Sequence, residues 1–140
     1  MKAKISIIIF TNLLICCNTY KRENFTYNQN EKQLWINSYK YEVFYGCIKE
    51  GLQNDSLRVI LKNRDLFNPN LELDFSTIDQ ARQIGKEIVD NLPTPFIKID
   101  QGDENLEGNK FISFACLNYY ASKELDSIAR IEYDMHKKKK

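Results

Sequence analysis

The stretch EKQLWINSYKYEVFYGCIKEGL, residues 31–52, decides the fold that the sequence predicts. Its apolar side chains recur at the three- and four-residue spacings that place them on one face of an α-helix. Gly51 and Asn54 stand near its end, where helices commonly stop. We therefore expect a helix over residues 31–52. Its inward face is expected to hold Ile36, Val43, Phe44, Cys47, Ile48 and Leu52.

Two further helices are expected downstream. Asp55 and Ser56 can cap a second helix that Asn68-Pro69 would end, although the aliphatic run 59–61 also permits a buried strand. Residues 70–75 fit a short strand, a linker or a first helical turn. The third helix starts at Ser76-Thr77-Ile78-Asp79, which has the form of a capping box, and Pro93 forbids its continuation. The apolar stripes are Leu57, Ile60, Leu61 and Phe67 in the second helix, and Ile78, Ala81, Ile84, Ile88, Val89 and Leu92 in the third.

Residues 110–134 form the last helical region. Ser122 can cap a fresh helix, so we expect a break near Ala121. Four or five helices with little strand signal predict an all-α fold, a small single-domain bundle. The side chains expected to pack are Phe111, Phe114, Ala115 and Leu117 in the first half, and Leu125, Ile128 and Ala129 in the second.

The four cysteines fall in two pairs with different expected roles. Cys47 and Cys116 lie in the first and last helical regions and are expected to form one disulfide in an oxidising compartment. Closing that loop stabilises a small domain by about 4 kcal/mol on the chain-entropy estimate. Two buried free thiols are the alternative, and an export signal favours the disulfide.

Residues 1–16 resemble a bacterial secretory signal that ends in a lipobox. Lys2 and Lys4 precede an apolar stretch shorter than the about 20 residues that span a bilayer. Cys17 is the better lipid acceptor, because bulky Ile15 would occupy the small-residue position if Cys16 were used. The alternatives are an ordinary signal peptide or an uncleaved anchor. We expect a periplasmic, membrane-anchored lipoprotein with a polar tether over 17–31, a helical domain over 32–134 and a basic tail over 135–140.

Charge separates the body of the domain from its tail. The whole chain carries net charge +1. Without Lys2, Lys4 and the run Lys137–Lys140, fourteen basic residues stand against nineteen acidic ones, a net charge near −5. An acidic body argues against nucleic acid as a partner. The lysine run can touch anionic surfaces but is more often a solvated end, so membrane contact is expected only through the lipid anchor.

Residues 93–110 form a long segment without helical or strand periodicity. The segment is rich in carboxylates, and it contains Gly102 and Gly108. A loop of this length in a compact domain is often functional, so we expect it to bind a partner. The candidate partner-binding residues are Asp100, Gln101, Asp103, Glu104, Asn105 and Glu107.

No set of residues in the sequence predicts catalysis, a metal or a cofactor. The single histidine, His136, precedes the lysine run, where neither a fixed partner nor a shielded pocket is expected. No cysteine–histidine cluster has zinc spacing, and no glycine-rich phosphate loop occurs. Asp100, Asp103 and Glu104 lack the ligand order of a calcium loop. Tyrosines that can line a ligand pocket, or more commonly serve as core rings with a hydrated hydroxyl, are Tyr39, Tyr41, Tyr45, Tyr119 and Tyr120.

The stretch CLNYYASKELD, residues 116–126, resembles the C-terminal signature of the type VI secretion amidase immunity proteins. In that family a Cys-Leu-x-x-Tyr-x-Ser-x-Glu-Leu-Asp pattern closes the domain. The upstream Tyr45-Gly46-Cys47-Ile48 is similar to the cysteine region of the family's first helix, whereas residues 58–75 lack its alanine- and serine-rich helix. The matched motif residues are Cys116, Leu117, Tyr120, Ser122, Glu124, Leu125 and Asp126.

The resemblance implies a periplasmic all-α inhibitor, often homodimeric, that binds a papain-like cysteine amidase acting on peptidoglycan stem peptides. On this interpretation the acidic loop enters the cleft of the amidase, and its carboxylates mimic the stem peptide. Five residues in the motif region are expected to be structural first and partner contacts second: Tyr119, Tyr120, Ser122, Glu124 and Asp126. Two other classes remain open: an envelope lipoprotein that serves as a scaffold or adaptor with no enzyme target, and a hydrolase with unusual carboxylates.

Overall fold

The computed structural model describes residues 24, 26, 29–53, 56, 59–60, 73–95 and 109–139. Four helices lie within these ranges: α2 (Glu31–Leu52), α4 (Phe75–Asp90), α5 (Ile112–Tyr120) and α6 (Lys123–Lys139). The same ranges contain no strand. The predicted all-α fold is therefore confirmed. None of the described helices is both long enough and apolar enough to cross a membrane.

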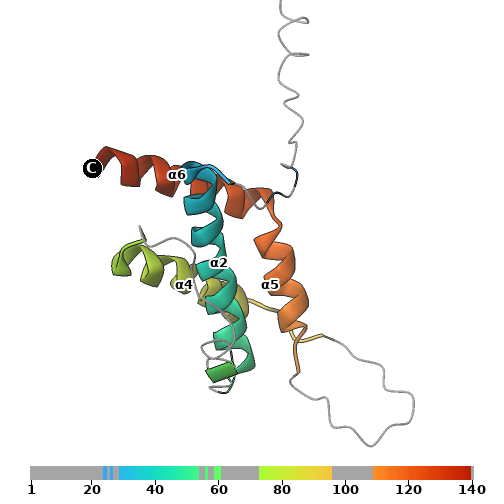
Figure 1. The fold of residues 1–140 in the computed structure, drawn as a ribbon. Coiled ribbons are helices and arrows are strands. Elements are labelled where there is room, and N and C mark those ends of the chain that lie inside the picture. The colour runs from blue at the N-terminus through green and yellow to red at the C-terminus, as the bar shows by residue number, and fades with distance from the viewer. Residues whose placement is uncertain are drawn as a thin grey trace, which may run out of the picture.

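Helix α2 is the central element, and it contacts α4, α5 and α6. In Figure 1, α4 and α5 lie on opposite sides of α2, and α6 crosses near its N-terminal end. The helix has the predicted bounds. The Asn30 side chain caps its start by accepting a hydrogen bond from the Gln33 backbone N–H at 2.8 Å, and Gln53 ends it in the left-handed conformation with φ 46°.

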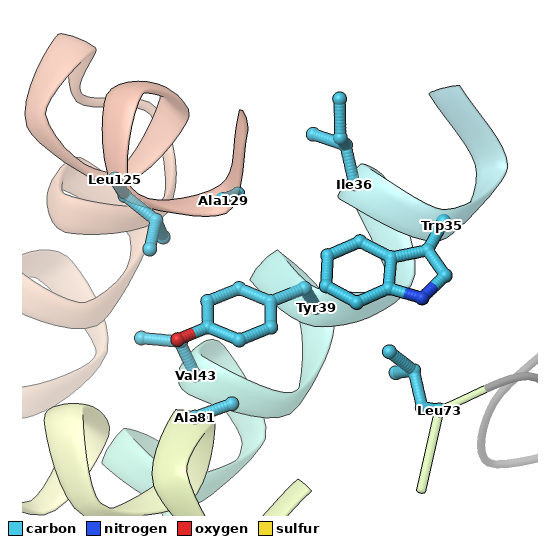
Figure 2. Packing of buried hydrophobic residues seen from close by; sticks show 8 residues of the cluster. All are labelled: Trp35, Ile36, Tyr39, Val43, Leu73, Ala81, Leu125 and Ala129. Carbon is cyan, nitrogen blue, oxygen red and sulfur yellow. The ribbon is translucent and has the colours of Figure 1, made fainter. Parts of the chain in front are cut away.

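The hydrophobic core forms where α2 meets α4 and α6. Trp35 stacks on Tyr39 with ring centroids 5.7 Å apart, and Tyr133 of α6 packs edge-on against Trp35 at 5.6 Å. Figure 2 shows the Tyr39 ring reaching between Leu125 of α6 and Ala81 of α4. Aromatic side chains bury a large apolar area each. The buried cluster comprises Trp35, Ile36, Tyr39, Val43, Leu73, Ala81, Leu125 and Ala129.

Helices α2 and α4 approach closely enough to bring their backbones into contact. A Cβ atom placed on Gly46 of α2 would lie 2.7 Å from the Arg82 carbonyl oxygen. A Cβ atom placed on Gly85 of α4 would lie 2.5 Å from the Cys47 backbone nitrogen. Both distances are shorter than van der Waals contact, so this crossing requires glycine in both helices.

The single apolar face predicted for α2 is too narrow. Helix α2 is covered from several sides, so Ser38, Lys40 and Glu42 are buried in addition to the predicted residues Ile36 and Cys47. The predicted Phe44 and Ile48 are half-buried, while Leu52 is exposed at the end of the helix. Helix periodicity identifies an element that packs on one side, and it underestimates the burial of a central helix.

The buried charges of α2 are held by ion pairs with neighbouring helices. Glu42 accepts a hydrogen bond from Arg82 Nε of α4 at 2.8 Å, and Arg82 Nη2 lies 2.8 Å from the same carboxylate oxygen. The Arg82 guanidinium also lies over the Tyr45 ring, 5.0 Å from its centroid. Since an uncompensated buried carboxylate is costly, Arg82 permits Glu42 to face α4.

The N-cap of helix α4 is Asp74, two residues before the predicted cap Ser76, so the helix begins at Phe75. The Asp74 carboxylate accepts hydrogen bonds from the Thr77 backbone N–H at 2.7 Å and from the Ser76 hydroxyl at 2.9 Å. These hydrogen bonds lower the pKa of Asp74 to about 2, and the bond from the Thr77 backbone has the largest effect. A charged carboxylate at the positive end of a helix caps it better than a neutral hydroxyl does. The helix ends at Asp90, before Pro93, as predicted.

The other predicted boundaries are met to different extents. Of the second predicted helix, only Ser56, Val59 and Ile60 are described; they are helical and exposed, and the rest lies outside the described residues. The predicted break near Ala121 is confirmed, since α5 ends at Tyr120 and α6 begins at Lys123. Helix α6 then continues to Lys139, past its predicted end at Asp134 and through most of the predicted basic tail.

Candidate protein-binding face

A disulfide between Cys47 of α2 and Cys116 of α5 fixes the position of α5. The two Cα atoms lie 5.8 Å apart, and both cysteines are buried. The predicted pairing is confirmed. At the start of α5, the Ile112 side chain lies directly against Gly51 near the end of α2, where a Cβ atom at residue 51 would meet it. Helix α5 is therefore attached to α2 by a covalent bond and by a close contact nearer the end of α2.

The disulfide also fixes which side of α5 faces inward. Ile112 and Tyr119 are on the same side of the helix as Cys116 and are half-buried. Phe114 and Leu117 are on the opposite side, and Phe111 precedes the helix as its N-cap residue; the exposed fractions of Phe111, Phe114 and Leu117 are 64, 69 and 59 %. The prediction that these three side chains pack the bundle is wrong, because the helical phase that buries Cys116 turns them outward.

We call the surface formed by Phe111, Phe114 and Leu117 the outward face of α5. Ser113 and Asn118 are also exposed, and α5 itself contains no charged residue. Large apolar side chains that gather on an otherwise uncharged surface are typical of protein-binding sites, and aromatic residues are enriched at the centre of such sites. The outward face is thus the strongest candidate site among the described residues.

The remaining motif residues have structural positions around the break between α5 and α6. The Ser122 hydroxyl accepts a hydrogen bond from the Leu125 backbone N–H at 3.1 Å, as a helix N-cap does. Leu125 is fully buried in the core. The Tyr119 hydroxyl donates a hydrogen bond to the Glu124 carboxylate at 3.3 Å. Glu124, in the first turn of α6, is thereby bonded to the end of α5.

Asp126 forms an ion pair with Lys40, which lies on α2 and is itself mostly buried. The Lys40 ammonium also lies over the Tyr120 ring, 4.9 Å from its centroid. Burial raises the pKa of Asp126, and the nearby Arg130 opposes this rise. Lys40 therefore joins α2 to α6 through its ion pair with Asp126, and to α5 through the Tyr120 ring. Of the seven motif residues, Leu117 is the one whose side chain belongs to the outward face.

The tyrosine hydroxyls of the core are suited to packing and not to proton transfer. Tyr39 is fully buried, and its hydroxyl has no hydrogen-bond partner among the described residues, so the expected hydrated hydroxyl is wrong for this residue. Burial, with Glu132 and Tyr119 nearby, raises the pKa of Tyr39 far above its ordinary value. Burial and the Glu124 carboxylate raise the pKa of Tyr119 to about 12. Both phenols remain protonated at neutral pH.

The described residues form no candidate metal-binding site. No group of three or more histidine, cysteine or carboxylate side chains among them is placed to hold a metal ion. His136 is not at a frayed end, as the sequence suggested, because its ring packs 5.4 Å from that of Trp35.

Two groups of predicted site residues lie outside the described residues. These are the lipid acceptor Cys17 with its alternative Cys16, and the acidic partner-binding segment. That segment, Asp100, Gln101, Asp103, Glu104, Asn105 and Glu107, joins the start of α5 through residues 108–111. Phe111 and Phe114 therefore follow it directly in the chain.

Comparison of the chain with protein-family models, with curated proteins and with solved structures gives no match.

Proposed function

We propose that this chain is an immunity protein that binds and inhibits a peptidoglycan-cleaving cysteine amidase of type VI secretion. The observation that carries the proposal is the outward face of α5: an uncharged apolar surface on a helix that a disulfide holds in place. The face lies inside the segment that resembles the amidase immunity family and directly follows the acidic partner-binding segment. A rigid apolar surface beside an acidic loop is suited to binding the rim and the cleft of an enzyme together.

The proposed mechanism is steric. Phe111, Phe114 and Leu117 dock on the rim of the amidase cleft, where their burial contributes most of the affinity. The segment 100–107 covers the catalytic Cys–His pair of the amidase, and its carboxylates meet basic groups beside the cleft. Complementary charge speeds the encounter, while the apolar contact slows dissociation.

Size supports the use of both elements. A standard protein–protein interface buries about 800 Å² on each partner and involves about 20–30 residues a side. The three exposed side chains of α5 cover only part of such an area, so a second contact segment is required. The acidic segment adjoins α5 in the chain and is long enough to supply it.

The proposed place of action is the periplasm, where peptidoglycan lies. Cys47 and Cys116 form the disulfide typical of an oxidising compartment. The signal-like residues 1–16 and the lipid acceptor Cys17 would hold the protein at a membrane through its tether.

The test asks whether a gene beside this one encodes such an amidase and whether the purified chain inhibits it. The purified protein should stop the release of stem-peptide fragments at a one-to-one ratio, and should release none by itself. Deletion of Gly102–Gly108 should leave the helical circular-dichroism spectrum intact and abolish inhibition.

A matched variant separates charge from shape in the loop. It replaces Asp100 and Asp103 with Asn, and Glu104 and Glu107 with Gln, so that the loop keeps its length. We expect its association rate with the amidase to fall roughly tenfold, with a smaller change in the dissociation rate. Full inhibition by the deletion variant would contradict the loop mechanism. Absence of an amidase among the neighbouring genes, together with transport or adhesion components there, would favour a scaffold lipoprotein instead.

A further inference from the structure

Helix α5 carries the outward face, yet little within the helix itself stabilises it. It has nine residues, and isolated helices shorter than about 12–15 residues are marginal in water. Its N-cap residue, Phe111, makes no side-chain capping hydrogen bond, and its first turn contains no acidic residue. The helical state and the position of α5 therefore depend on contacts with the neighbouring helices.

Besides the disulfide, α5 is held by side-chain contacts near its two ends. At its start, the Ile112 side chain lies against Gly51 of α2. At its other end, the Tyr120 ring packs edge-on against Phe44 of α2, with ring centroids 5.9 Å apart. Cys116 lies between these contacts and is the only residue of α5 that is fully buried. The disulfide therefore holds the middle of the helix against α2.

Apolar side chains lie on both sides of α5, so burial of apolar area alone does not select the observed orientation. Ile112 and Tyr119 are half-buried on the inner side, while Phe114 and Leu117 are mostly exposed on the outer side. Rotation of the helix would exchange one apolar surface for the other. The disulfide selects between them, because it keeps Cys116 turned toward α2.

We propose that oxidation of Cys47 and Cys116 is the condition for presenting the outward face of α5. Before the disulfide forms, the helix is not held with Phe114 and Leu117 outward, and the reduced chain does not bind its partner. The protein then becomes competent to bind only in an oxidising compartment. The loss of partner binding rests on the proposed function, whereas the dependence of α5 on the disulfide does not.

The disulfide forms by thiol–disulfide exchange with an oxidant that itself contains a disulfide. The thiolate of one cysteine attacks the oxidant to form a mixed disulfide, and the thiolate of the other displaces the oxidant as a dithiol. The two electrons and the two thiol protons end on the oxidant. Both cysteines are buried once paired, so a thiol reaches the bond only when α5 opens. Burial therefore shields the oxidised state from reduction.

Amide hydrogen exchange of the full chain tests the dependence of α5 on the disulfide without any partner. All samples carry Cys16→Ser and Cys17→Ser, so that only the two body cysteines can react. The oxidised chain is compared with the chain refolded in a dithiol reductant and with the Cys47→Ala, Cys116→Ala variant. In both unbonded forms, the amides of α5 should exchange roughly tenfold faster or more than in the oxidised chain.

A matched variant separates this effect from a general loss of stability. Gly85→Ala keeps the disulfide and is expected to destabilise the crossing of α2 and α4. In this variant, exchange in α5 should increase no more than exchange in α4, whereas in the unbonded forms it should increase more. Equal protection of α5 with and without the disulfide would overturn the proposal, as would an equal increase over all four helices in the unbonded forms.

Affinity for the amidase that the proposed function requires gives the second measurement. The Cys47→Ala, Cys116→Ala variant should bind roughly tenfold more weakly or worse, because the binding-competent fraction of the chain falls. Gly85→Ala should bind like the oxidised chain. Equal affinity of the unbonded and oxidised chains would overturn the proposal. If α5 exchanges faster without the disulfide but the oxidised chain binds no such amidase, the proposed function fails and the redox dependence of the outward face is supported.

Discussion

Where α2 crosses α4, backbone meets backbone, whereas on the outward face of α5 three large apolar side chains stay more than half exposed. Gly46 and Gly85 permit the first arrangement, and the Cys47–Cys116 disulfide imposes the second. Folding thus buries the inner face of α4 against α2 and leaves the outer surface of α5 unused. An apolar surface that does not contribute to folding is available for binding.

The comparison separates two kinds of residue that look alike in the sequence. Val43 and Phe114 are both apolar residues at helical spacing, yet Val43 is buried and Phe114 is 69 % exposed. Substitutions at the crossing and at the disulfide should therefore change stability, and substitutions on the outward face should change binding alone. The predictions below follow this contrast from the largest change in stability to the smallest.

Removal of the disulfide should cause the largest loss of stability. In the Cys47→Ala, Cys116→Ala variant, the free energy of unfolding should fall by about 4 kcal/mol, because the unfolded chain regains the freedom of a loop between residues separated by 69 positions. Urea denaturation followed by circular dichroism measures the change. A reducing agent should produce a similar loss in the wild-type protein and none in the variant. A loss below about 1 kcal/mol would show that α5 does not depend on the bond.

The glycine of α4 should be the next most sensitive position. Gly85→Ala should lower the free energy of unfolding by about 2–3 kcal/mol, because its Cβ would meet the Cys47 backbone nitrogen at 2.5 Å and the helices would have to separate. In an ordinary exposed helix position the same change stabilises by up to about 1 kcal/mol.

Gly51→Ala is the matched control for that crossing. Its Cβ would meet the Ile112 side chain, which can rotate away, whereas Gly85 faces backbone atoms that cannot. We expect thermal unfolding to show a clearly smaller loss for Gly51→Ala than for Gly85→Ala. Equal losses would mean that the α2–α4 crossing is no tighter than the contact between α2 and α5.

Stability should also depend on pH through the Asp74 cap. The pKa of Asp74 is about 2 in the folded protein against an ordinary value of 3.8, so the charged cap stabilises the fold above about pH 4. This contribution is lost as the pH falls from about 4 through 2. Asp74→Asn retains an amide oxygen as acceptor but cannot titrate. Its unfolding midpoint should therefore fall less steeply than that of the wild type over this pH range, and identical slopes would exclude the cap as the cause.

The sequence predicted elements that depend on local signals. The bounds of α2, the break near Ala121 with Ser122 as cap, and the Cys47–Cys116 disulfide all follow from periodicity, capping chemistry and cysteine pairing. The outward face of α5 was missed because α5 is apolar on nearly every side. The spacing of its apolar residues therefore does not indicate which side of the helix faces the core. The disulfide supplies that information: once Cys116 is turned inward, Phe114 and Leu117 must point out.

The glycine crossing and the buried ion pairs depend on tertiary contacts that no local pattern contains. Gly46 and Gly85 become close only when α2 and α4 cross. Lys40 and Asp126 are far apart in the chain and become partners only when α6 packs on α2. A charged residue within a helix is normally interpreted as solvent-exposed, so the sequence could not reveal that Lys40 and Glu42 are buried.

The most direct test of the central claim measures stability and affinity in one variant, Phe114→Asp. Since Phe114 is 69 % exposed, thermal unfolding should change by less than about 0.5 kcal/mol. Calorimetric titration with the amidase that the proposed function requires should show affinity weakened at least hundredfold, as at an interface hot spot. Phe75→Asp makes the same substitution on the other side of α2 and should bind like the wild type. Wild-type affinity in Phe114→Asp, or a variant that no longer folds, would contradict the claim that the outward face of α5 exists for a partner.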